Sequence, residues 1–131
     1  MKRLLDTNAY SALGRGHPSA AELVRQATEV LFSTVVLGEV LAGFRHGTRY
    51  QDNLDRLRRF LAEPRVRLVP VTWTTADRYS RLFAALRRKG RPIPTNDMWI
   101  AAHALETGAD LVSFDPHFGH VEGLAWVKPD V

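Results

Sequence analysis

Apolar and polar positions alternate along this chain in short and long blocks. Short apolar runs bounded by turn-forming residues predict strands, and longer stretches with apolar residues three and four apart predict helices. The expected strands are residues 2–5, 30–32, 66–71, 111–114 and 124–127. The expected helices are residues 9–13, 18–28, a stretch from Ser33 or Thr34 to near Gly47, residues 50–61, a stretch from residue 74 or 75, and residues 97–106. This alternation predicts an α/β fold with a mostly parallel sheet covered on both faces.

Two of the expected helices carry a clear apolar stripe. In residues 50–61, apolar side chains recur with helical spacing until Pro64 stops the helix. In the helix from residue 74 or 75, Tyr79, Phe83 and Leu86 share one stripe. We expect both stripes to pack against the rest of the molecule.

The composition is that of an ordinary globular domain. The chain has 131 residues, 45% of them hydrophobic, and we expect residues 1–131 to form one domain. The absence of cysteine excludes disulfides, zinc-thiolate sites and a cysteine nucleophile. The longest apolar stretch, residues 35–44, is interrupted by Glu39 and two glycines, and the first apolar run is too short for a signal peptide. We therefore expect no membrane association and a cytoplasmic location.

The net charge of +4 is unevenly distributed. Residues 45–91 have thirteen basic and four acidic side chains, a net charge of +9, whereas residues 92–131 have one basic and six acidic side chains, a net charge of −5. Such a distribution is typical of a protein that binds a polyanion and has a separate carboxylate cluster.

Three aspartates lie at the ends of expected elements. Asp6 and Asp115 each follow a strand, and Asp97 lies in the first turn of a helix. Each has an ordinary structural explanation as a helix cap, a turn residue or a partner of the helix dipole. However, parallel sheets bind their ligands beyond the carboxyl ends of their strands, where these side chains are expected.

Glu39 is harder to explain structurally. Its helix is apolar around much of its circumference, and no basic residue occurs between Arg25 and Arg45. A buried carboxylate is costly unless it is paired or bound to a metal. Four such carboxylates predict a cluster of hard oxygen ligands for Mg²⁺ or Mn²⁺, of the kind that metal-dependent phosphodiesterases use.

At these positions the sequence resembles the PIN-domain family. The resemblance is carried by LLDTN at residues 4–8, TVVLGE at 34–39, NDMWIAA at 96–102 and SFDPHF at 113–118. The four motifs occur in the family's order, at family-like spacing, over essentially the whole chain. The short length is similar to that of VapC-type toxins of bacterial toxin–antitoxin pairs.

The resemblance implies a fold, an activity and partners. The fold would be a three-layer α/β/α domain with a central mostly parallel sheet. The activity would be a Mg²⁺- or Mn²⁺-dependent endoribonuclease, and the partners an RNA substrate, a small antitoxin protein and a second copy of the chain in a homodimer. The implied metal-binding and catalytic residues are Asp6, Glu39, Asp97 and Asp115, with Asn8 and Ser113 as supporting polar residues.

Some basic residues are candidates for RNA contact. Arginines that follow an aspartate by four residues, in the pairs 52/56, 55/59 and 77/81, are expected to be neutralised on exposed helix faces. The phosphate-contact candidates are Arg45, Arg49, Arg87, Arg88, Lys89 and Arg91.

The remaining conspicuous residues are expected to be structural. His117 and His120 are interpreted as exposed loop histidines without metal-binding roles, and His103 as a packed or partly exposed histidine rather than a catalytic base. Tyr50, Tyr79 and Phe83 fit packing better than base stacking. By the resemblance, an apolar groove between the first helices and helix 50–61 would receive an antitoxin peptide.

Two other functions remain open. One is a catalytically degenerate PIN module that only binds nucleic acid or a protein partner. The other is a phosphohydrolase for small phosphate esters, against which the +9 segment argues because a mononucleotide needs no extended basic surface.

Overall fold

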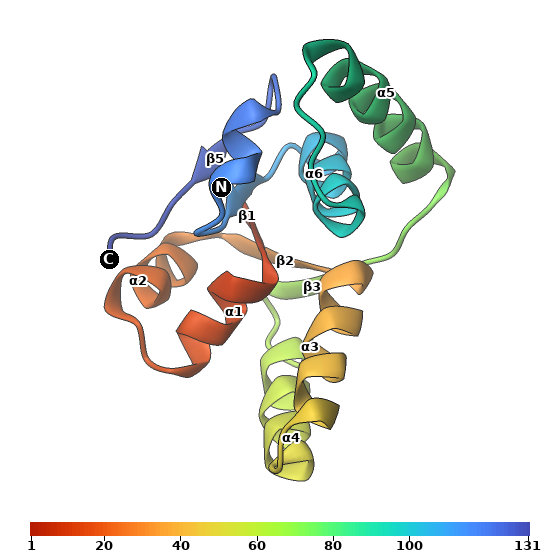
Figure 1. The fold of residues 1–131 in the computed structure, drawn as a ribbon. Helices are drawn as coiled ribbons and strands as arrows, with labels where there is room; N and C mark the ends of the chain where they lie inside the picture. The colour runs from red at the N-terminus through yellow and green to blue at the C-terminus, as the bar shows by residue number, and fades with distance from the viewer.

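The computed structural model describes residues 1–131 and has a five-stranded sheet between two layers of helices (Figure 1). All neighbouring strands are parallel, and the strand order is β3-β2-β1-β4-β5. The strands are β1 (Lys2–Leu5), β2 (Glu29–Ser33), β3 (Val66–Val69), β4 (Asp110–Val112) and β5 (Trp126–Val127). The predicted α/β fold with a parallel sheet is confirmed.

The helices divide between the two faces of the sheet. Helices α1 to α4 lie on one side, and α5 and α6 pack against each other on the other side (Figure 1). Their bounds are α1 (Thr7–Gly14), α2 (Pro18–Gln26), α3 (Thr34–His46), α4 (Tyr50–Leu61), α5 (Trp73–Lys89) and α6 (Thr95–Thr107), with a 3₁₀ helix, η1 (Pro116–His120), between β4 and β5. None of these helices combines the length and apolar character needed to cross a membrane.

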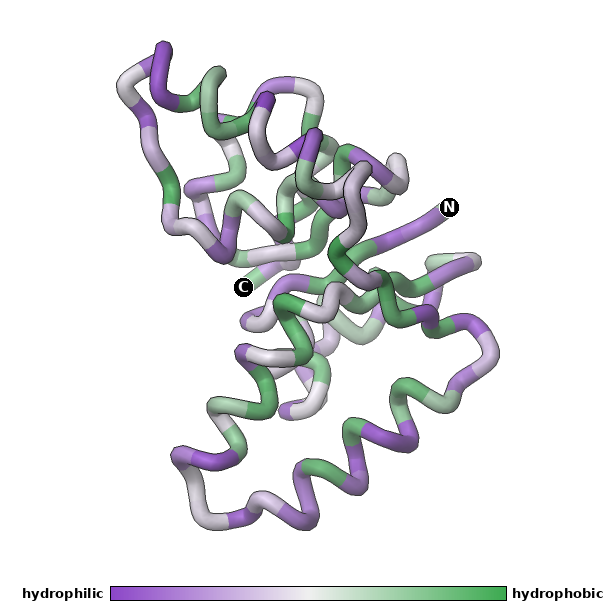
Figure 2. The backbone as a smooth tube through the Cα atoms, turned by 90° about the vertical axis from the view of Figure 1, so that its right-hand side faces the viewer, coloured by the Kyte–Doolittle hydropathy of each residue, from purple (hydrophilic) through white to green (hydrophobic).

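The core is centred on the middle strands. Leu4 of β1 lies opposite Leu31 of β2 and Leu111 of β4, and all three side chains are fully buried. Tyr10 and Phe60 pack edge-on against Phe32, with ring centroids 5.3–5.7 Å apart in this group. Figure 2 shows the hydrophobic strands in the middle of the molecule and the alternation of hydrophobic and hydrophilic residues along α4. Burial of the strands on both faces explains their continuous apolar runs.

The element ends differ from the predicted ones by no more than two residues. Strand β3 stops at Val69 because Pro70, which follows, has no N–H to donate to the sheet. Helix α5 begins at Trp73, because Thr72 and Thr75 form a reciprocal capping box around its first turn.

The expected inward stripe of α5 is partly wrong. The buried residues of this helix include Leu82 and Leu86, whereas Phe83 is 43% exposed. Tyr79 does pack as predicted, because it is half-buried against the core and stacks on Trp99 of α6 with ring centroids 4.0 Å apart. Helix α5 packs mainly against α6 rather than against the sheet.

The order of the strands reverses at β1, the middle strand of the sheet. The chain leaves β1 to build β2 and β3 on one side, and it returns to build β4 and β5 on the other. Ligands of open parallel sheets bind at such a reversal of strand order, beyond the carboxyl ends of the strands. The residues that follow β1 and β4 are Asp6 and Ser113.

Candidate metal centre

Asp6 caps a helix and is also one of the four predicted carboxylates. It is the N-cap of α1, and its Oδ1 accepts a hydrogen bond from the Thr7 backbone N–H at 2.8 Å. Its Oδ2 accepts a hydrogen bond from Ser113 Oγ at 2.6 Å. The residue is only 5% exposed, so both interactions hold a nearly buried carboxylate at the end of β1.

The environment of Asp6 opposes its ionisation. The pKa of Asp6 is raised from 3.8 to about 6, chiefly by burial and to a smaller extent by the negative charges of Asp97 and Glu39. The hydrogen bonds from Ser113 and Thr7 lower the pKa but do not outweigh burial. No basic side chain is among the causes that act on the Asp6 pKa.

Ser113 and Asn8 connect this carboxylate to the loop after β4. Ser113 Oγ, besides donating to Asp6, accepts a hydrogen bond from the Asp115 backbone N–H at 3.0 Å. Asn8 Oδ1 accepts a hydrogen bond from the Phe114 backbone N–H at 3.2 Å, and Asn8 Nδ2 lies 3.4 Å from Ser113 Oγ. Both residues thus lie where supporting polar residues were predicted.

Glu39 reaches the same place from α3. Its Oε1 accepts a hydrogen bond from Thr7 Oγ1 at 2.6 Å, and its Oε2 accepts one from Asn96 Nδ2 at 3.2 Å. The premise that its helix is buried is wrong, because α3 fully buries only Val36 and Val40 and Glu39 is half-buried. Glu39 nevertheless has no ion-pair partner within 4 Å.

Asp97 and Asp115 approach each other around His117. Asp97 lies in the first turn of α6, and Asp115 lies in the loop three residues beyond the end of β4, where it caps η1. The His117 Nδ1 atom is 3.0 Å from Asp115 Oδ1 and 3.3 Å from Asp97 Oδ2. Burial, together with the charges of Asp115 and Glu39, raises the pKa of Asp97 above its ordinary value, although the hydrogen bond with His117 opposes this shift.

His117 is exposed, as predicted, but its surroundings differ from the prediction. Its side chain is 46% exposed and belongs to η1, and its ring faces two of the four carboxylates. One donor atom each from Asp97, Asp115 and His117 lies within 4.8 Å of the others, close enough to hold one metal ion. His103 agrees with the prediction, because it is packed between Ser33 and Pro70. His120 is half-buried at the end of η1 rather than exposed, and its backbone carbonyl accepts a hydrogen bond from Lys89.

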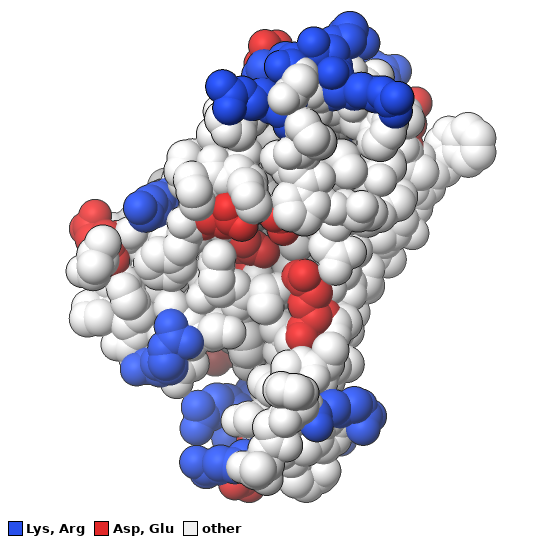
Figure 3. All heavy atoms as spheres, in the orientation of Figure 1, with Lys and Arg blue, Asp and Glu red and all other residues white.

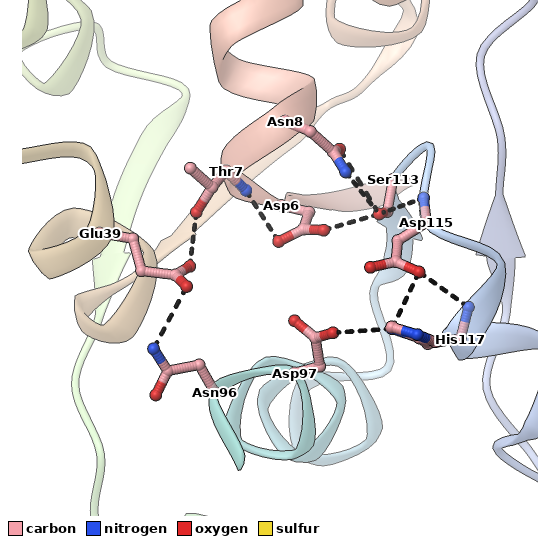
Figure 4. Close-up of polar contacts among 9 residues, drawn as sticks. All are labelled: Asp6, Thr7, Asn8, Glu39, Asn96, Asp97, Ser113, Asp115 and His117. Carbon is pink, nitrogen blue, oxygen red and sulfur yellow. Dashed lines mark hydrogen bonds and ion pairs between the residues drawn. The ribbon is translucent and has the colours of Figure 1, made fainter. Parts of the chain in front are cut away.

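All four predicted carboxylates line one open hollow of about 420 Å³ (Figure 4). No hydrophobic residue lines it; the other lining residues are Thr7, Asn8, Ser11 and Arg15. Carboxylate oxygens are the ligands that Mg²⁺ and Mn²⁺ prefer, and the raised pKa values of Asp6 and Asp97 indicate that a cation would stabilise the cluster. The donor set therefore fits a divalent metal ion.

The predicted RNA-contact residues lie outside this hollow. Arg49 pairs with Asp52 at 3.2 Å, and Arg45 lies over the Tyr50 ring at 4.4 Å. Lys89 donates to the His120 carbonyl at 2.8 Å, and Arg87 lies 6.0 Å from the centre of the Phe83 ring. Figure 3 shows the carboxylates in the middle of the face, with basic side chains at its upper and lower ends.

The expected pairing of arginines on helix faces holds for one pair of the three. Arg81 and Asp77 form an ion pair at 3.2 Å. Asp52 pairs instead with Arg49, and Arg56 donates to the Gly14 carbonyl of α1 at 3.3 Å. Asp55 has no ion-pair partner within 4 Å.

Comparison with protein families decides the classification. The model of the family described as "PIN domain" matches residues 3–124. The chain belongs to the PIN-domain family. The match covers the carboxylates that the four motifs contribute.

Curated and solved relatives span nearly the full length of this PIN domain. Ribonuclease VapC1 of Haemophilus influenzae is 28% identical over 128 residues, which cover 94% of each chain. The plasmid stability protein StbB of Pseudomonas syringae pv. tomato is 32% identical over 136 residues, which cover 96% of each chain. The crystal structure of VapBC2 from Rickettsia felis bound to a DNA fragment from its promoter is similar with a TM-score of 0.87 and 28% identity, covering 99% of this chain and 100% of the matched chain.

Sequence reasoning missed several residues of this PIN-domain site. His117 lies two residues after Asp115, but it was interpreted as an exposed loop histidine; Arg15 and Asn96 were assigned no role. Thr7 could have been found, because its hydroxyl lies directly beside Asp6 in the first motif. The other contacts depend on how loops far apart in the sequence meet, which the motifs do not specify.

Proposed function

We propose that this PIN domain is a Mg²⁺- or Mn²⁺-dependent endoribonuclease that hydrolyses RNA phosphodiester bonds, and that it is the toxin of a toxin–antitoxin pair. The observation that carries the proposal is the convergence of four acidic side chains, from β1, α3, α6 and the loop after β4, on one open polar hollow. The name of the relative Ribonuclease VapC1 supports a nuclease acting on RNA.

In this proposal Asp6, Glu39, Asp97 and Asp115 are the catalytic and metal-binding residues, and His117 offers a further ligand atom. A bound divalent cation would supply a nucleophilic water at neutral pH and would stabilise the charge that develops on the phosphate. Ser113 holds the Asp6 carboxylate and the Asp115 backbone at fixed positions, and Thr7 holds Glu39. These neutral donors orient the carboxylates without neutralising them, so the carboxylates keep their charge for the cation.

The experiment is cleavage of a closed circular RNA by the purified protein with Mn²⁺. An endonuclease cuts a circle, whereas an exonuclease needs an end. We expect wild type to linearise the circle and the Asp97→Asn variant to be inactive while remaining folded. Asp77→Asn, which removes an exposed carboxylate of an ion pair on α5, should cleave at the wild-type rate. Equal cleavage by wild type and Asp97→Asn would disprove the proposed site.

The alternative of a degenerate binding module is tested by metal titration. All four acids are present and face one hollow, which favours an active site. A ligand that binds only the folded state raises the melting temperature with its concentration. We expect Mn²⁺ to stabilise wild type and not Asp97→Asn; no stabilisation of wild type would favour the degenerate module.

The proposed partners are a small antitoxin and a second copy of the chain. A hollow of about 340 Å³ between α1 and α4, lined by Tyr10, Leu13, Gly14, Arg56 and Phe60, agrees with the predicted groove for an antitoxin peptide. Co-expression with a small neighbouring gene, followed by size-exclusion chromatography with light scattering, tests both partners. A chain that stays monomeric and captures no product of that gene would contradict them.

A further inference from the structure

Arg15 is the only cationic residue that lines the carboxylate hollow. It follows the last residue of α1, and its backbone N–H is bonded to the Ser11 and Ala12 carbonyls at 3.2 and 3.1 Å. Gly16, which follows with a φ of 77°, turns the chain away. The backbone of Arg15 is therefore fixed at the rim of the hollow.

The guanidinium of Arg15 has no partner in the protein. It makes no side-chain hydrogen bond and no ion pair within 4 Å, even though four carboxylates line the same hollow. Arg25, Arg49, Arg67 and Arg81, in contrast, are each paired with a carboxylate. Because Arg15 neither neutralises the cluster nor braces the fold, its side chain is free to bind an anion that enters the hollow.

A second hollow adjoins the carboxylate hollow at Arg15. Ser11 and Arg15 line both, and the second hollow, of about 210 Å³, is also lined by Asn53 and Arg56 of α4. A second arginine thus lies in the hollow next to the one that contains the carboxylates. An extended ligand can pass Arg15, whereas a small phosphate ester would end there.

We infer that Arg15 binds a backbone phosphate of the RNA next to the one that is cleaved, and so holds the strand across the carboxylate hollow. This inference rests on the proposed function. A planar guanidinium can bind two phosphate oxygens at once, and a phosphate at Arg15 would leave the carboxylates to the metal-dependent chemistry. It assigns substrate contact to a residue outside the basic segment 45–91.

The experiment measures RNA binding in an Asp97→Asn background, in which RNA is not cut. A fluorescein-labelled single-stranded RNA of mixed sequence is titrated at several KCl concentrations and one fixed Mg²⁺ concentration. For single strands the slope of log Kobs against log [salt] changes by about 0.7 for each phosphate contact. We expect Arg15→Gln to bind RNA more weakly and to flatten the slope by about 0.7. Arg15→Lys, which keeps the charge, should retain the slope.

The control is Arg25→Gln, which removes the same charge from an exposed ion pair on α2. It should keep the slope of the parent, and both variants should keep its melting temperature. An unchanged slope in Arg15→Gln, or an equal change in Arg25→Gln, would overturn the inference and leave Arg15 to another ligand, such as a carboxylate of a protein partner. A parent that does not bind RNA at all would instead refute the proposed function itself.

Discussion

At the scale of single residues, Asp6 combines two roles that the sequence presents as alternatives. Its carboxylate caps α1 through the Thr7 N–H and also lines the carboxylate hollow. A capping carboxylate stabilises its helix, but this one is nearly buried among like charges. The ionised Asp6 carboxylate therefore lowers the free energy of unfolding of the metal-free protein, and a bound cation would offset this loss.

The first prediction concerns the stability of the metal-free protein. Because the folded pKa of Asp6 is about 6 and its reference value is 3.8, the folded state holds a proton that the unfolded state has lost between these values. The free energy of unfolding therefore falls as the pH rises from 4 to 6, and by pH 7 the cost is on the order of 3 kcal/mol. We expect Asp6→Asn in EDTA to be more stable than wild type at pH 7, and this difference to shrink by about 1 kcal/mol at pH 5.

Urea unfolding at the two pH values measures this difference. Asp55→Asn, which removes an exposed carboxylate of α4, should show no comparable dependence on pH. A stability difference between wild type and Asp6→Asn that is the same at both pH values would contradict a raised pKa.

The second prediction concerns His117. Imidazole nitrogen suits Mn²⁺ better than Mg²⁺, which prefers oxygen and water. We expect His117→Ala to lower the affinity for Mn²⁺ about tenfold and the affinity for Mg²⁺ less, as measured by calorimetric titration without RNA. His120→Ala, three residues further on and without contact to the carboxylates, is the control. Unchanged Mn²⁺ affinity in His117→Ala would show that its ring only neighbours the site.

The sequence singled out the four carboxylates, whereas it showed His117 only as a neighbour of Asp115 and did not indicate its contact with Asp97. Each acid lies at the end of an apolar element or on an apolar helix, where a charge needs an explanation. His117 gains its contacts because η1 turns the chain back toward the first turn of α6. No pattern of hydrophobic residues encodes that turn.

At the scale of elements, the site depends on the junction of β1 with β4. These strands pair directly, and Ser113 extends the junction by bonding both the Asp6 side chain and the Asp115 backbone. The sequence predicted both strands, but not that they are neighbours. Their pairing follows from the return of the chain across β1, which alternating elements alone do not determine.

The third prediction tests this junction. Ser113→Ala leaves the Asp6 Oδ2 atom without its hydrogen bond, so we expect the affinity for Mn²⁺ to fall about 10- to 100-fold. Ser33→Ala is a matched control, because Ser33 is equally buried and caps α3 away from the hollow. Both variants should lose stability in thermal unfolding, but only Ser113→Ala should lose metal affinity. Equal losses of affinity would mean that Ser113 acts only through general stability.

At the scale of the whole molecule, the basic segment 45–91 does not form one surface. It contains α4, β3 and α5, and the crossover after β3 places α4 and α5 at opposite ends of the molecule (Figure 1). The basic side chains of this segment, whose net charge is +9, therefore lie on either side of an acidic centre (Figure 3). Composition indicated a polyanion partner, but only the fold shows that the cation at the hollow, Arg15, comes from residues 1–44, in which four basic and four acidic side chains leave no net charge.

The central claim is that RNA hydrolysis depends on a divalent cation held by the four carboxylates. The most direct measurement is the single-turnover rate of RNA cleavage by wild-type protein in EDTA, after which either Mg²⁺ or Mn²⁺ is added back. We predict no cleavage in EDTA and full recovery with either cation, because the carboxylates themselves supply no nucleophilic water at neutral pH. Cleavage that continues unchanged in EDTA would contradict the account.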